Sequence, residues 1–134
     1  MASRVIRLRR LEATLLKLKD VIAGRLAALA EERQALHRKR EAIAQLMNGD
    51  TRFLDLTTGG ALRRLTAIAV RLSAIDGEEA VQRRRAASAV LKARRAADSA
   101  KAIARAQARL ADRQALSELA DQLRPASLPQ VEPS

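Results

Sequence analysis

Apolar residues recur every seven positions along the first third of the chain, a spacing typical of a coiled-coil helix. We label this position a; its residues are Leu8, Leu15, Ile22, Leu29, Leu36 and Ile43. The d position lies three residues later and holds Leu11, Leu18, Arg25, Glu32, Lys39 and Leu46. The pattern predicts one helix over residues 3–47, with an apolar a/d seam near both ends and charged d residues in the middle.

A second heptad pattern begins after residue 60 and predicts a helix over residues 61–123. Its a and d positions up to residue 110 are Leu65, Ile68, Leu72, Ile75, Glu79, Gln82, Ala86, Ala89, Ala93, Ala96, Ala100, Ile103, Gln107 and Leu110. Asp76-Gly77 lies inside this helix, where a glycine costs about 1 kcal/mol relative to alanine. Either the helix tolerates the glycine with a slight kink, or it breaks there and a new helix begins near Asp76.

Residues 48–60 between the two patterns predict a loop. Asn48-Gly49-Asp50 is a helix stop followed by turn residues, and Thr57-Thr58-Gly59-Gly60 is a second break in the periodicity. The residues between them include Phe53, Leu54 and Leu56, which are too apolar for a solvent-exposed loop that only connects two helices. They either fold back to cap the end of the hairpin or form an exposed docking surface. Residues 125–134 contain three prolines and no periodicity, which predicts a disordered tail.

Together the two patterns predict an all-α fold, a long antiparallel two-helix coiled-coil hairpin with a C-terminal helical overhang. With the turn centred near residue 54, Leu15 faces the layer of Ala93 and Ile22 faces Ala86. Arg25 and Glu32 then face residues 76–83, where paired charges fix the register of the two helices. The second helix extends past the first by about four turns, so residues 108–123 have no partner helix.

Composition excludes several classes of function. Phe53 is the only aromatic residue and there is no cysteine, which argues against a thick core, disulfides and thiolate metal sites. The longest apolar run has five residues, whereas a membrane-spanning helix needs about 20. We expect a cytoplasmic protein without membrane insertion. His37 is the only histidine, and no base–nucleophile pair or phosphate-binding loop accompanies it. We therefore expect no enzyme, no cofactor and no metal site.

The formal net charge of +11 makes the basic clusters the main candidates for binding. One cluster is N-terminal and contains Arg4, Arg7 and Arg10. A second follows i, i+4 spacing on the overhang and consists of Lys101, Arg105, Arg109 and Arg113. Like charges at this spacing repel by about 0.2–0.5 kcal/mol per pair, so the row either serves an acidic protein partner or is a solvated face. Nucleic-acid binding is the alternative, although no aromatic platform for stacked bases is present.

The Arg4–Arg10 segment leading into leucine heptads, and the Arg-, Ala- and Gln-rich stretch from Arg83 to Leu123, resemble the FliJ family of flagellar export proteins and its YscO-like injectisome counterparts. The resemblance implies a non-enzymatic central stalk of a type III secretion system. It implies two protein partners, the export ATPase ring at the open ends of the hairpin and the export gate protein at the loop. It makes Phe53, Leu54 and Leu56 the candidate residues for contact with the gate.

Overall fold

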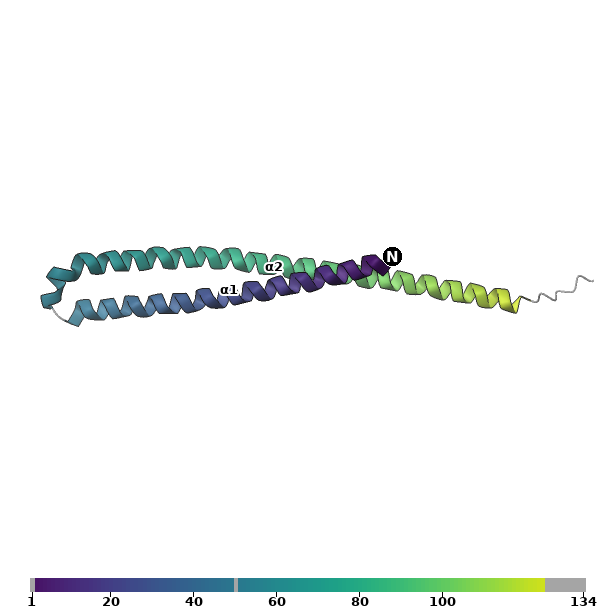
Figure 1. The fold of residues 1–134 in the computed structure, drawn as a ribbon, viewed down its shortest axis with the longest axis horizontal. Coiled ribbons are helices and arrows are strands. Elements are labelled where there is room, and N and C mark those ends of the chain that lie inside the picture. Colours follow the sequence, from purple (N-terminus) through teal and green to yellow (C-terminus); the bar gives the residue numbers. More distant parts are fainter. Residues whose placement is uncertain (1, 50, 125–134) are drawn as a thin grey trace, which may run out of the picture. The chain divides into compact units, whose positions relative to one another are not determined.

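The fold is an all-α helical hairpin, as the periodicity predicts. A computed structural model describes residues 2–49 and 51–124, with side chains described for residues 3–48 and 59–124. Helix α1 spans Ala2–Gly49 and helix α2 spans Thr51–Leu123. The two helices run antiparallel and side by side (Figure 1). None of the described residues forms a strand, and no described helix carries an apolar stretch long enough to cross a bilayer.

The chain divides into two compact units, which are described separately: residues 13–93, and residues 1–12 together with 94–134. The first unit is the hairpin proper, and its core is a single seam of apolar side chains. Leu29 of α1 and Ile75 of α2 are fully buried there. Ile22 and Ile68 are also buried, with only 4% and 7% of their surface exposed. Two facing stripes therefore supply the apolar burial that stabilises helices of this length.

The heptad assignment is confirmed for α2 but only half confirmed for α1. In α2 the buried residues Ile75, Ala89 and Ala93 all occupy a or d positions. In α1 the a residues turn inward, whereas the d residue Leu18 is 47% exposed and Arg25 is exposed as well. The inner face of α1 uses the e position instead, including the partly buried residues Leu26 and Arg33. This rotation keeps charged d side chains out of the seam, where burial would be costly.

The predicted loop over residues 48–60 is wrong, because α1 continues to Gly49 and α2 already begins at Thr51. Gly59 and Gly60 adopt no positive φ, so they lie within the helix at a cost of about 1 kcal/mol each. The side chains of Phe53, Leu54 and Leu56 lie outside the described residues, as does the predicted tail 125–134. The Asp76-Gly77 step does not break α2, which is continuous.

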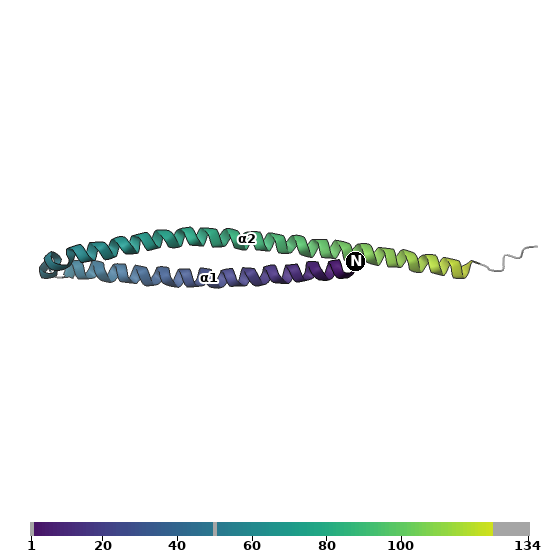
Figure 2. The ribbon, with the colours of Figure 1, turned by 45° about the horizontal axis from the view of Figure 1, so that its top comes forward.

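The second unit contains the predicted overhang. Ala96 and Ala100 of α2 are buried, and Ile103 and Gln107 are partly buried. Every described residue from 108 to 124 is exposed. Figure 2 shows α2 continuing, in yellow-green, beyond the N-terminus of α1. The last four turns of α2 therefore have an uncovered surface around the whole helix.

Candidate functional site

The basic row on the overhang is fully available to a partner. Lys101, Arg105, Arg109 and Arg113 are exposed, and none of them forms an ion pair with a residue that the structure describes. The helical spacing continues this row into Leu116, which is 65% exposed. The same end of α2 carries further exposed leucines: Leu110, Leu119 and Leu123. One end of α2 thus offers a cationic row followed by apolar side chains.

The N-terminal arginines belong to the same unit as the overhang. Arg4, Arg7 and Arg10 are all exposed. The Nε of Arg7 donates to the backbone oxygen of Ser3 at 3.4 Å, a local bond within the first turns of α1. Their spacing of three residues spreads these arginines over about a third of the helix circumference. The structure therefore keeps them accessible but does not gather them into a defined cradle.

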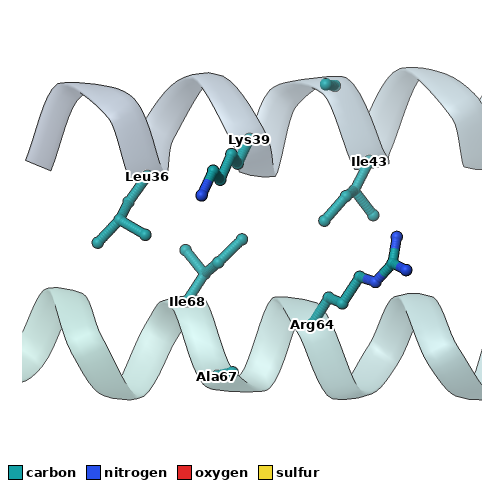
Figure 3. A pocket seen from close by; sticks show the side chains of 7 residues that line it. Leu36, Lys39, Ile43, Arg64, Ala67 and Ile68 are labelled. Carbon is teal, nitrogen blue, oxygen red and sulfur yellow. The ribbon is translucent and has the colours of Figure 1, made fainter. Parts of the chain in front are cut away.

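A shallow groove of about 530 Å³ lies between the helices in the hairpin unit, on the side toward the turn. Figure 3 shows Leu36 and Ile43 of α1 pointing toward Ile68 of α2 across this gap. Lys39 and Arg64 project along it as the two charged lining residues. The resemblance predicts Phe53, Leu54 and Leu56 for contact with the gate protein. Their side chains lie outside the described residues.

The middle of the hairpin contains a network of ion pairs between the helices. The Nε and Nη2 atoms of Arg71 donate to both carboxylate oxygens of Glu32, at 2.5 Å and 2.9 Å. Arg25 Nη2 donates to Glu78 Oε2 at 2.9 Å. Arg71 Nη1 also lies 3.6 Å from Glu78 Oε1, which joins the two pairs. The hydrogen bond from Arg71 lowers the pKa of Glu32, and the same bond raises the pKa of Arg71.

A second part of this network surrounds Glu79, the one buried charged residue among those described. Arg33 Nη1 lies 2.7 Å from Glu79 Oε1, and Arg33 Nη2 donates to Asp76. Arg83 adds a longer contact to Glu79, at 3.7 Å. The hydrogen bond to Glu79, followed by that to Asp76, raises the pKa of Arg33 against the opposing effect of burial. Each of these charged side chains therefore has an oppositely charged partner, and most of the pairs join the two helices.

Sequence reasoning found half of this network. It expected Arg25 and Glu32 to meet residues 76–83, and Arg25 does meet Glu78. Glu32 instead pairs with Arg71. Arg33 forms the ion pair with residues 76–83 that the heptad pattern predicts for Glu32. Arg33 and Arg71 occupy e and g positions, which commonly carry ion pairs between coiled-coil helices. A search for opposite charges at the e and g positions of both helices would have identified Arg33 and Arg71 from the sequence.

The described residues contain no group of three or more His, Asp or Glu side chains arranged to hold a metal ion. His37 is exposed on the outer face of α1. No protein-family model, no curated protein and no solved structure matches this chain.

Proposed function

We propose that the protein is a non-enzymatic coiled-coil stalk or adaptor of a type III protein export apparatus, which links the export ATPase ring to the export gate protein. The observation that carries this proposal is the uncovered end of α2. The exposed basic row begins at Lys101 and Arg105 and continues with Arg109 and Arg113 into the segment after residue 107, where every described residue is exposed.

Several features of the described residues support a role as a mechanical connector. The hairpin is held in register by paired charges, including Arg33–Glu79 and Arg71–Glu32. Such pairs favour one alignment of two helices over its slipped alternatives. An uncovered helical end with a row of cations suits an acidic surface, such as the inside of a ring. Binding to such a surface reduces the repulsion between the like charges of the free helix. Location in the cytoplasm is part of the same proposal.

The test is binding to the export ATPase of the same organism. The variant Arg105→Gln, Arg109→Gln, Arg113→Gln removes three exposed charges without touching the buried seam. We expect it to keep its helical circular dichroism, to bind the ATPase about tenfold or more weakly, and to lose any stimulation of ring assembly. The matched control is Arg63→Gln, Arg84→Gln, Arg94→Gln, which removes three exposed arginines of α2 outside the basic row. Equal weakening by both variants would contradict a role for the row.

Nucleic-acid binding is the second candidate, because the exposed arginines of α2 include the run Arg83 to Arg85. Duplex DNA and single-stranded RNA of random sequence provide the test. Micromolar affinity near physiological salt, with a steep decrease as salt rises, would favour this function over the stalk. Binding that disappears near physiological salt leaves the export proposal in place.

A further inference from the structure

A second groove runs along the hairpin unit, away from the turn, and has an apolar floor with a cationic rim. Its volume is about 620 Å³. The floor includes Leu15, Leu18 and Val21 of α1, together with Ala89 of α2. Leu18 and Val21 are 47% and 69% exposed. The rotation of α1 that brings e residues inward leaves these d and g side chains outside the seam.

The groove is hollow because the two helices contribute side chains of unequal size. Leucines and valine project from α1, whereas Ser88 and Ala89 face them from α2. The lining extends from Leu15 to Arg25 on α1, about 15 Å along the helix axis, which equals about three helical turns. Both walls are helices whose backbone groups are already hydrogen-bonded, so an added strand finds no open edge. An amphipathic helix is the occupant that such a groove accepts.

The charges at the rim define the chemistry of that helix. Arg85 and Lys92 line the groove from α2, and Arg25 lines it from α1. Arg25 is already held by Glu78, but Arg85 and Lys92 form no ion pair with any residue that the structure describes. The lining residues include no carboxylate. Two uncompensated cations above an apolar floor attract carboxylates that flank an apolar stripe and repel cationic helices.

We propose that this groove is a docking site for an acidic amphipathic helix of a partner protein, about three turns long, whose apolar stripe covers Leu18 and Val21 and whose carboxylates pair with Arg85 and Lys92. The site lies within residues 13–93 and shares no residue with the basic row of the overhang. The proposal therefore goes beyond the export function and does not depend on it.

The test uses two synthetic helical peptides with the same leucine stripe, one flanked by glutamates and one by lysines. Fluorescence anisotropy with the full chain should show binding of the acidic peptide and at least about tenfold weaker binding of the basic one. The variant Arg85→Glu, Lys92→Glu should reverse this preference. The variant Leu18→Ser, Val21→Ser should abolish binding of the acidic peptide while the circular dichroism stays helical, because both side chains are largely exposed.

The matched control is Arg63→Glu, Arg84→Glu, which makes the same change in net charge at exposed positions outside the groove. Binding should survive in this control and in the Arg105, Arg109, Arg113 variant. Equal loss in the control and the groove variant would overturn the proposal, because the attraction would then be general charge. Equal binding of both peptides would also overturn it. So would a dimer of the chain that the Leu18, Val21 variant dissociates, because a second copy would then be the occupant.

Discussion

Arg33 Nη1 lies 2.7 Å from Glu79 Oε1, and this contact places the one buried charge among the described residues against a partly buried guanidinium. Glu79 occupies an a position, where coiled coils normally carry an apolar side chain. Its carboxylate is satisfied by Arg33 and, at longer range, by Arg83. The pair therefore favours one alignment of the helices at the expense of apolar burial.

This pair predicts opposite results for single and double substitution. Glu79→Ala should lower the free energy of unfolding by about 1–3 kcal/mol, because Arg33 loses its buried acidic partner. Arg33→Leu with Glu79→Leu should raise it by about 1 kcal/mol, since well-packed apolar residues often outperform a buried ion pair. Thermal unfolding followed by circular dichroism measures both effects. A double variant less stable than the single one would contradict this account.

The same substitutions at Arg25 and Glu32 should have little effect. Their side chains are 50% and 38% exposed, so they are not the buried d residues that the heptad pattern predicts. Exposed ion pairs are worth about 0–1 kcal/mol. Arg25→Leu with Glu32→Leu should therefore leave the melting temperature nearly unchanged, in contrast to the Arg33, Glu79 pair. A clear rise in the melting temperature would show that these charges are more buried in solution.

The pKa of Glu32 predicts a dependence of stability on pH. Its pKa in the folded protein lies below the ordinary value of 4.5, chiefly because Arg71 donates a hydrogen bond to the carboxylate. The stabilisation is therefore complete above 4.5 and is lost as the pH falls through the lower, folded value. Urea unfolding of the wild type and of Glu32→Gln at a series of pH values should show two curves that converge in acid. Two curves that stay separated by the same amount at low pH would contradict a contribution from the Glu32 carboxylate.

Much of the fold follows from the sequence because the a residues of α1 and the a and d residues of α2 form regular apolar stripes. Leu29 and Ile75 were both on the predicted seam and are fully buried. Two features did not follow. The rotation of α1 depends on two free-energy costs, that of burying the charge of Arg25 and that of exposing the side chain of Leu18. The residues of α2 that face them decide which cost is larger. The start of α2 at Thr51 did not follow either, because Gly59-Gly60 lies within the helix, whereas two consecutive glycines usually predict a break.

The small residues of α2 predict sensitivity to added volume. Ala100 is fully buried in the unit that contains the N-terminal residues, whereas Ala102, two positions later, is exposed. Ala100→Leu should destabilise the packing of residues 2–12 by about 1–3 kcal/mol, since a close-packed interface has no room for three more carbon atoms. Ala102→Leu is the control and should change stability by less than about 0.5 kcal/mol. Hydrogen exchange of the amides in residues 3–12 reports the difference directly.

The uncovered end of α2 predicts rapid amide exchange. Residues 108–123 lack a packed face, and an isolated helix of this length is marginal in water. Their amides should exchange much faster than those of residues 22–36 in the hairpin, and addition of a partner that binds the basic row should slow them. Equal protection of the two segments in a demonstrated monomer would contradict an unsupported helix. A partner that binds without slowing the exchange would place its contact elsewhere.

The central ion pairs also have a consequence for the order in which the hairpin folds. Contacts near the turn close the smallest loops, and each doubling of loop length costs only about 0.6 kcal/mol more, so zippering from the turn is the favoured route. Along this route Glu32 meets Arg71, 39 residues away, before the alanine-rich layers form. A slip of one heptad in one direction brings Glu32 beside Glu78 and Arg25 beside Arg85, whereas a slip in the other direction brings Arg25 beside Arg71 but Glu32 beside Arg64. Like charges thus oppose the first of these slipped hairpins at both positions before the alanine-rich layers close.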